Sequence, residues 1–218
     1  MNHPPLPIIP PHADFSPAAN RNREPIFESI LPWLDQIAQV SSRSDVSLLE
    51  IASGTGQHAA YFASRYPTLT IQPSDLVEDN ADSVNAWAES LNVNDQVASL
   101  LALDVRMSAQ WPKRHFDVIF CANMIHISPW SATEALFKES PLHLNQHGLI
   151  ITYGPYRFET PLAPSNLAFD ESLRSRNREW GIRSIEELDR LAFTFGLERI
   201  ETIACPAHNH ILIFRRLS

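Results

Sequence analysis

Cysteine is scarce in this chain of 218 residues, which has only Cys121 and Cys205. Cys121 stands inside an apolar run and is predicted to be buried, and the two residues fit neither a disulfide framework nor a metal site. Because chains without a disulfide framework are typical of reducing compartments, we expect a cytoplasmic protein. The HNH tripeptide at residues 208–210 lies near Cys205 but lacks the spacing of a zinc motif, so we expect no metal.

Basic residues are also few, with 17 Lys and Arg against 25 Asp and Glu, and the formal net charge is −8. A nucleic-acid binder needs a basic surface, so this balance argues against DNA or RNA as a direct partner.

Long apolar runs are missing as well. No stretch approaches the ~20 apolar residues of a membrane span, and the N-terminus lacks the charged and apolar regions of a secretory signal. We therefore expect no membrane partner.

Proline, by contrast, is abundant, and it gathers near the N-terminus. The prolines of residues 4–11 favour an extended, polyproline-like segment, which we assign to an N-terminal arm of residues 1–20. Residues 21–218 then form a single domain, since this length supports one hydrophobic core. Within it, residues 154–183 are an irregular insert that we expect on the substrate side.

Helical and strand patterns alternate through the domain. The spacing predicts a helix over 23–40, in which Pro32 forces a kink or a division into two short helices. Further helices are predicted over 57–66, 77–91, 131–137 and 184–195, the last two opened by capping boxes at Ser131–Glu134 and Ser184–Glu187. Strands are predicted over 46–51, 69–72, 97–103, 116–121, 149–153, 197–204 and 211–214.

This alternation is typical of an α/β fold, a doubly wound, Rossmann-like sheet with helices on both faces. The last two strands are joined by the six residues CPAHNH, which are too few for a crossover, so these strands must pair antiparallel. We therefore predict a seven-stranded, mostly parallel sheet with an antiparallel C-terminal strand. Ligands of such folds bind beyond the carboxyl ends of the strands.

The loop after the first strand has the glycine pattern of nucleotide-binding proteins. Residues 54–59 read GTGQHA, which fits G-x-G-x-x-A, and Asp75 lies 21 positions beyond Gly54. In the dinucleotide fingerprint an acidic residue at about this distance binds the ribose hydroxyls. This pattern supports an NAD-dependent oxidoreductase, which stays open as an alternative.

Glu50, at the end of the first strand, favours a different ligand. A carboxylate there would repel a pyrophosphate, whereas S-adenosylmethionine has no phosphate and carries an ammonium and a sulfonium. Asp75 can accept both ribose hydroxyls, and Asp104, followed by Val105, can accept from the adenine amino group. Each acid alone also fits a solvated turn or a helix cap, but a row of three at successive strand ends suits a cationic, adenosine-bearing ligand.

At these residues the chain resembles the class I S-adenosylmethionine-dependent methyltransferases, whose first motif is [D/E]-x-G-x-G-x-G. Residues 50–56 read EIASGTG, with Ala52 in place of the first glycine. The chain is also similar to a small methyltransferase-like family of unassigned substrate, through SPAANRNREPI, QPSD, CANMIHISPW, YGPY and SNLAFDESLRSRNREWGIR. The resemblance implies the seven-stranded fold with a reversed final strand, and S-adenosylmethionine as cofactor with S-adenosylhomocysteine as product. It also implies cofactor contacts by Ala52, Ser53, Gly54 and Gly56.

The segment before the first helix adds two expected cofactor contacts. Arg21 can reach the cofactor carboxylate and Asn22 can assist, although Asn22 also fits a plain helix cap. His58 opens the second helix near the expected position of the sulfur, and its alternative is a solvent-facing residue of the first turn.

The residues that follow the fourth and fifth strands are candidates for the chemistry, because methyl transfer requires a positioned nucleophile and often a proton acceptor. Asn123 is placed beside the methionine moiety. His126 is a candidate base or substrate contact that can titrate near neutrality, and its alternative is a histidine that shapes the loop. Tyr153 is a candidate for orienting the substrate, with core packing as its alternative.

The insert supplies the expected substrate contacts. Arginines beside an aromatic residue indicate a carboxylate or phosphate on the substrate, and the alternative is a helix laced with salt bridges. The candidates are Tyr156, Asn166, Asp170, Arg174, Trp180 and Arg183.

Together these patterns predict methyl transfer from S-adenosylmethionine to a small, anionic molecule. The acceptor atom stays open between oxygen, nitrogen and sulfur. Beside the oxidoreductase, a second alternative is a non-catalytic protein that binds S-adenosylmethionine or serves an interaction on the same frame.

Overall fold

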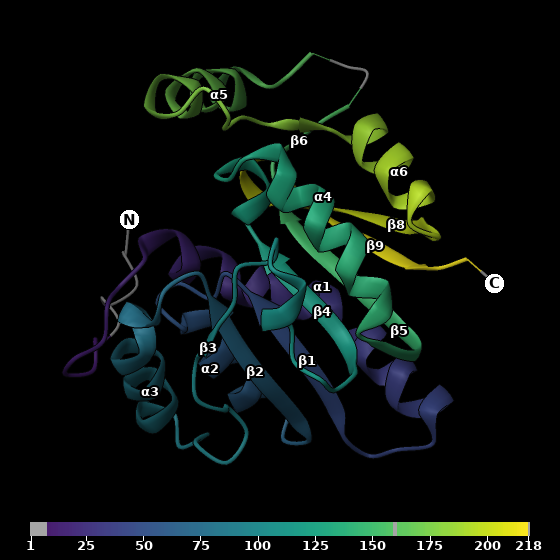
Figure 1. Cartoon of the computed structure of the whole chain (residues 1–218). Coiled ribbons are helices and arrows are strands. Elements are labelled where there is room, and N and C mark those ends of the chain that lie inside the picture. The colour runs from purple at the N-terminus through teal and green to yellow at the C-terminus, as the bar shows by residue number, and fades with distance from the viewer. Residues whose placement is uncertain (1–7, 159–160, 218) are drawn as a thin grey trace.

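A seven-stranded sheet forms the centre of the computed structural model, which describes residues 8–158 and 161–217 (Figure 1). The strand order is β3-β2-β1-β4-β5-β9-β8. All neighbours are parallel except β9, which runs antiparallel to both β5 and β8. The predicted fold class is therefore confirmed, including the reversed final strand. The strands of the sheet are β1 (Val46–Ile51), β2 (Leu69–Asp75), β3 (Leu101–Ala102), β4 (Phe116–Ala122), β5 (Leu144–Gly154), β8 (Leu197–Cys205) and β9 (Asn209–Arg216).

Helices cover both faces of the sheet because side chains alternate along each buried strand. In β1, Leu48 packs in the core below α1, α2 and α3, whereas its neighbour Leu49 packs in the core below α4 and α6. Both side chains are fully buried. The helices are α1 (Pro17–Ser41), α2 (Gln57–Arg65), α3 (Ala81–Ser90), α4 (Trp130–Glu139), α5 (Pro164–Arg176) and α6 (Ile185–Thr194).

The first helix differs from its prediction in length and continuity. α1 begins at Pro17 instead of near residue 23, and it runs unbroken to Ser41 with Pro25 and Pro32 inside it. The side chain of Ser16 caps its first turn by accepting a hydrogen bond from Ala19 N at 3.2 Å. The division into two helices was therefore wrong, because tertiary packing of the apolar face outweighs the backbone hydrogen bond that a proline removes.

Three local predictions have different outcomes. The third strand is shorter than predicted, since only Leu101–Ala102 pairs with β2, beside an isolated bridge between Val97 and Ile71. The cap predicted at Ser131 is wrong, because α4 already begins at Trp130 after Pro129. The capping box at Ser184 is confirmed, with the Glu187 carboxylate accepting from Ser184 N at 3.4 Å.

The predicted arm is tied to the domain where the structure describes it. Asp14 N donates to Ser83 Oγ at 2.9 Å, and Trp87 Nε1 donates to Asp14 O at 2.9 Å. Ser16 N donates to Gln57 Oε1 at 2.6 Å. The segment before α1 therefore lies across α2 and α3, while residues 1–7 of the arm are outside the described residues.

The insert folds into α5 and a two-stranded parallel sheet of β6 (Tyr156–Arg157) and β7 (Arg183–Ser184). In Figure 1 these elements lie above the sheet, apart from the two helical layers. α5 therefore stands beyond the carboxyl ends of β4 and β5, where an α/β fold holds its ligands. Within the ranges 8–158 and 161–217, no helix has both the length and the apolar character that crossing a bilayer requires.

Candidate functional site

The loop between β1 and α2 holds three residues in the left-handed backbone region: Ala52 at φ 56°, Gly54 at φ 53° and Gly56 at φ 81°. A β-carbon at Gly54 would meet open space, whereas one at Gly56 would stand 2.7 Å from Val84 Cα in α3. Gly56 is therefore required where α2 and α3 approach each other, and Gly54 is the glycine that leaves space for a ligand.

Ala52 is expected to be strained, because the left-handed region costs a residue with a β-carbon about 1 to 2 kcal/mol. Part of this is offset by the greater entropy that glycine loses on folding, so Ala52→Gly should raise the free energy of unfolding by roughly 0.5 to 1 kcal/mol. Urea denaturation monitored by circular dichroism measures the change. A lower stability would mean that the packing of the Ala52 methyl group, which lies against the core below α4, outweighs the backbone strain.

Asp75 closes the loop onto β2. Its carboxylate accepts hydrogen bonds from Gly54 N at 2.7 Å and from Leu76 N at 2.7 Å. The backbone of Ser53, just before Gly54, is also bound to β2, since Ser53 N donates to Ser74 O at 2.8 Å. A carboxylate oxygen has two lone pairs, so Asp75 keeps acceptor capacity for ribose hydroxyls while it holds the loop.

Asp104 lies after β3 and is paired with a neighbour that the sequence prediction did not consider. Arg106 grips it through Nε at 2.9 Å and Nη2 at 2.6 Å, and these hydrogen bonds hold the pKa of Asp104 below its ordinary range. The Val105 carbonyl accepts from Trp111 Nε1 at 3.0 Å, which fixes the backbone beside Asp104. An adenine amino group would share this carboxylate with Arg106.

Glu50 is buried at the carboxyl end of β1, with 2% of its surface exposed and Oε2 without a hydrogen-bond partner. Burial raises its pKa to about 8. His58 Nδ1 lies 3.8 Å from Glu50 Oε1, and His58 Nε2 is 2.8 Å from Asn22 Oδ1. Burial also lowers the pKa of His58 to about 4, so this imidazole is neutral at neutral pH. The solvent-facing alternative for His58 was therefore wrong, as was the capping alternative for Asn22, which lies inside α1.

A cavity of about 590 Å³ opens at the carboxyl ends of β4 and β5, between α1, α5 and the turn that joins β8 to β9. Asn22 links its wall through His58 to Glu50. Five of the predicted cofactor or chemistry residues line it, and so does one predicted substrate contact: Arg21, Asn22, Asn123, His126, Tyr153 and Asn166. Residues that sequence reasoning did not choose also line it, among them Ser165, Phe169, Arg176 and Asn209.

His126 lines the same cavity, and its side chain is almost fully buried. Its Nδ1 has no hydrogen-bond partner, and a β-carbon at Gly154 would stand 3.0 Å from that atom. Burial lowers the pKa of His126 to about 4, so the ring is neutral and able to accept a proton. The ring of Phe169 in α5 meets it edge-on at 5.7 Å between centroids.

Tyr153 and Tyr156 leave β5 in different environments. Tyr153 lines the cavity and is largely buried, which raises its pKa. Tyr156 Oη donates to Thr152 Oγ1 at 2.8 Å inside the core, away from this cavity. The structure thus brings Tyr153, and not Tyr156, to the residues that surround His126.

Most of the other predicted substrate contacts are occupied by partners within the chain. Asp170 accepts from Arg174 Nε at 2.9 Å and from Ile182 N at 2.6 Å, which ties α5 to the end of the insert. Arg183 donates to three backbone carbonyls, those of Ile125, Ser128 and Glu179. Asp170, Arg174 and Arg183 therefore brace the insert. The Asp170–Arg174 pair is a salt bridge within the helix, as the alternative predicted, whereas Arg183 binds backbone carbonyls. Trp180 lies 5.7 Å from the guanidinium of Arg176, which does line the cavity.

Metal ligation has no candidate in the described residues. Within 8–158 and 161–217, no three His, Cys, Asp or Glu side chains are placed to hold one ion. The histidines of the β8–β9 turn do not converge with Cys205, whose side chain is 3.8 Å from Ile203 O.

Comparison with known proteins gives one family and a common fold. The model of a family described as "Protein of unknown function (DUF938)" matches residues 13–216. Among solved structures, an O-methyltransferase family protein from Burkholderia thailandensis is similar with a TM-score of 0.71 and 14% identity, over 92% of this chain and 60% of that one. An O-methyltransferase family 2 protein from Planctomyces limnophilus, in complex with apigenin, has a TM-score of 0.70 and 21% identity, over 79% and 51%.

A third structure is the O-methyltransferase NcsB1 from neocarzinostatin biosynthesis, in complex with S-adenosylmethionine and 2-hydroxy-5-methyl naphthoic acid. Its TM-score is 0.65 and its identity 13%, over 78% of this chain and 49% of that one. This chain thus spans about half to three fifths of the length of the proteins it matches. At these identities the likeness shows the fold of S-adenosylmethionine-dependent methyltransferases.

Proposed function

Since the chain belongs to the DUF938 family, whose description assigns no function, we propose its function from the site: methyl transfer from S-adenosylmethionine to a small molecule. The observation that carries this proposal is Glu50. A carboxyl group without a partner at Oε2, buried at the end of β1 and linked through His58 and Asn22 to the cavity wall, fits a cationic ligand. Once ionised, this carboxylate would repel a dinucleotide pyrophosphate.

Arg21 on the cavity wall, and four residues of the strand ends and the β1–α2 loop that do not line the cavity, then take distinct roles toward this co-substrate. Arg21 binds its carboxylate, and Glu50, once ionised, compensates its positive charge. Gly54 lets the loop approach it closely, since nothing fills the space of a β-carbon there. Asp75 accepts from the ribose hydroxyls, and Asp104 accepts from the adenine amino group. When bound, S-adenosylmethionine supplies an electrophilic methyl group on a sulfonium.

If the methyl acceptor is a hydroxyl group, the neutral His126 can act as its general base. Its imidazole, buried on the cavity wall, accepts the hydroxyl proton as the oxygen attacks the methyl carbon and the bond from that carbon to sulfur breaks. The products are the methyl ether, S-adenosylhomocysteine and an imidazolium that returns its proton to water. Asn123 and Tyr153 orient the two molecules. The O-methyltransferases that share the fold support an oxygen acceptor.

Calorimetric titration of the full chain with S-adenosylmethionine, S-adenosylhomocysteine and NAD tests this proposal. We expect both adenosyl ligands to bind and NAD not to bind. Asp75→Asn should weaken binding by about 10- to 100-fold, because it loses charge-assisted hydrogen bonds worth roughly 1.5 to 3 kcal/mol. Glu89→Gln, on the exposed face of α3, is the matched control and should leave binding unchanged.

Binding of NAD in place of the adenosyl ligands would favour the oxidoreductase. Binding of the adenosyl ligands without methyl transfer to any member of a metabolite pool would favour a non-catalytic binding protein. No binding of either adenosyl ligand would overturn the proposal.

A further inference from the structure

The cavity is cationic in a protein that is acidic overall. The chain has 25 acidic residues against 17 basic ones. Among the described residues, however, those that line the cavity include Arg21 and Arg176 and no Asp or Glu. Because a low-dielectric wall focuses the field of such charges, the parts of the cavity beside these two arginines favour negatively charged groups, such as a carboxylate.

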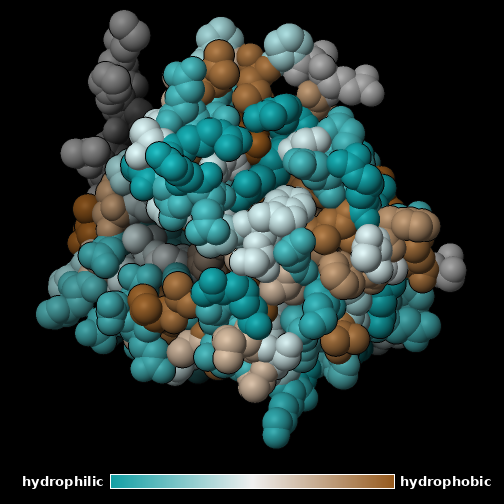
Figure 2. Space-filling model, turned by 45° about the horizontal axis from the view of Figure 1, so that its top comes forward, coloured by the Kyte–Doolittle hydropathy of each residue, from teal (hydrophilic) through white to brown (hydrophobic). Residues whose placement is uncertain are grey.

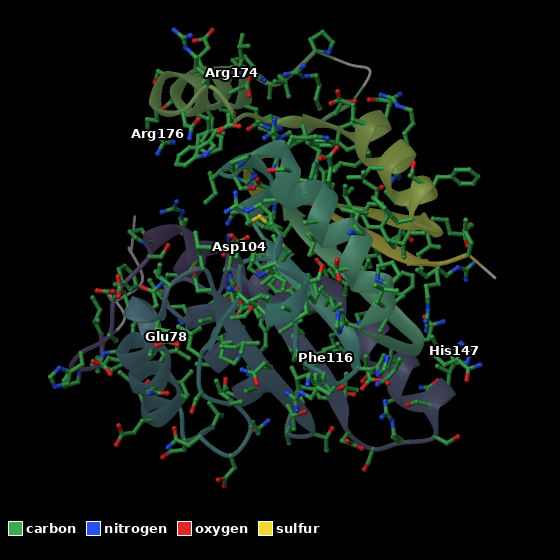
Figure 3. All side chains as sticks on the ribbon, in the orientation of Figure 1. Glu78, Asp104, Phe116, His147, Arg174 and Arg176 are labelled. Carbon is green, nitrogen blue, oxygen red and sulfur yellow. The ribbon has the colours of Figure 1, made fainter. Side chains whose placement is uncertain are left out.

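Arg176 is the arginine of the insert that lines the cavity. Arg174 and Arg157 lie 2.9 Å and 3.7 Å from the carboxylate of Asp170, and Arg183 is bound to backbone carbonyls. Arg176 donates from Nε to Ser172 O at 3.3 Å and rests over Trp180, but within the described chain no carboxylate lies within ion-pair distance of it. Figure 3 shows it on the side of α5 that faces the sheet, with Asp104 below.

One face of α5 presents several kinds of group to the cavity. Asn166, Phe169 and Arg176 are spaced by three and seven residues, so they share that face. Phe169 is 37% exposed, and Ile127 across from it is 41% exposed, so apolar surface is available inside a polar cavity. In Figure 2 the described apolar residues of this side of the molecule form separate patches among hydrophilic ones. Such a surface suits a small ligand with an apolar body.

We propose that the acceptor is a small aromatic hydroxy acid, with its acid group on Arg176, its ring against Phe169 and Ile127, and its hydroxyl at His126. This inference rests on the proposed function, in which Arg21 binds the carboxylate of the methyl donor and leaves Arg176 for the acceptor. The contact of Phe169 with the His126 ring at 5.7 Å places the apolar body next to the proton acceptor. A negative charge in the cavity also favours the imidazolium, so the acid group strengthens His126 as a base.

The test uses the full chain saturated with S-adenosylhomocysteine, and calorimetry of that ligand comes first. Its failure to bind would overturn the proposed function, a result distinct from any outcome below. The probes are hydroxybenzoates and hydroxycinnamates, each paired with its neutral amide. We expect the acids to bind to the complex and each amide to bind at least tenfold more weakly.

Arg176→Gln should reduce the binding of the acids by at least tenfold and bring them level with the amides. Arg178→Gln, an exposed arginine two positions along the same segment, is the control and should change nothing. Equal binding of acid and amide by the unmodified protein, an unchanged affinity in Arg176→Gln, or no binding by any acid of the panel would each overturn the inference. S-adenosylhomocysteine binding by Arg176→Gln checks that the variant keeps its fold.

Discussion

Glu50→Gln is expected to stabilise the ligand-free protein at about pH 8 and to weaken its binding of S-adenosylmethionine. In the folded chain, burial raises the pKa of Glu50 from 4.5 to about 8. The unfolded chain releases this proton above about pH 4.5, so between the two values the unfolded state binds fewer protons than the folded one. The contribution of Glu50 to stability is therefore fully present below pH 4.5 and is lost as the pH rises toward 8.

The loss is a large fraction of the stability of an ordinary domain, which is about 5 to 15 kcal/mol. A pKa difference between 4.5 and about 8 corresponds to roughly 4 to 5 kcal/mol at the top of this window, at ~1.36 kcal/mol per unit. Glutamine has the shape of the protonated acid and does not ionise, so the variant does not lose this energy. Urea denaturation at about pH 5 and about pH 8 should show a falling stability for the natural chain and a much smaller fall for Glu50→Gln. The exposed Glu89→Gln serves as control, and curves that stay parallel for all three proteins would contradict the prediction.

Binding of the cationic ligand changes in the opposite direction, because only the carboxylate compensates its charge. We expect S-adenosylmethionine to bind the natural chain more tightly as the pH rises toward 8, with release of a proton from Glu50. Glu50→Gln should raise the dissociation constant by at least ~10-fold and remove most of this pH dependence. Calorimetry in two buffers of different ionisation enthalpy counts the released protons. The buried acid thus lowers the stability of the ligand-free protein and raises its affinity for the ligand, a trade-off between stability and function that is common at functional sites.

The sheet and its row of acids could be predicted because they follow from local patterns and one topological rule. β1, β2 and the loop after β3 carry Glu50, Asp75 and Asp104 at one edge, since parallel strands place their carboxyl ends together. Six residues between the last two strands leave no other pairing than an antiparallel one, and the structure has it. Each acid was recognised from the residues directly beside it, and the topology of a parallel sheet then placed the three together.

The extent of α1 could not be predicted because its prolines give the wrong local signal. Pro25 and Pro32 lie inside a helix whose face of Ile26, Ile30 and Leu34 is completely buried. This burial, at roughly 1.5 to 3 kcal/mol for each side chain, exceeds the loss that a proline causes. The energy comes from contacts with the sheet and α2, which the local pattern does not contain.

The roles of the arginines could not be predicted for a related reason. Composition places Arg174, Arg176 and Arg183 in one polar insert, and all three fit an anionic ligand equally well. Only the folded chain shows that Asp170 holds Arg174, that backbone carbonyls hold Arg183, and that Arg176 alone of the three lines the cavity. The helical spacing of Phe169 and Arg176 was the signal that could have separated them.

The second large effect is expected at Gly56. Gly56→Ala should lower the free energy of unfolding by about 2 to 5 kcal/mol, the sum of ~1 to 2 for a left-handed backbone and ~1 to 3 for overpacking. The clash is with the backbone of α3, since the new β-carbon would stand 2.7 Å from Val84 Cα and 2.9 Å from Val84 Cγ2. A helix backbone does not move aside as the end of a flexible side chain does. Urea denaturation measures the loss.

Gly54→Ala is the matched comparison, because its φ of 53° carries a similar backbone strain while a β-carbon there meets open space. It should cost only ~1 to 2 kcal/mol of stability, yet weaken S-adenosylmethionine binding more than Gly56→Ala does, because the new methyl group occupies the space left for the ligand. An equal loss of stability in the two variants would contradict the packing role of Gly56. The two glycines of one motif thus act on different partners, Gly56 on the neighbouring helix and Gly54 on the ligand, and the order of their effects reverses between the folding and the binding measurement.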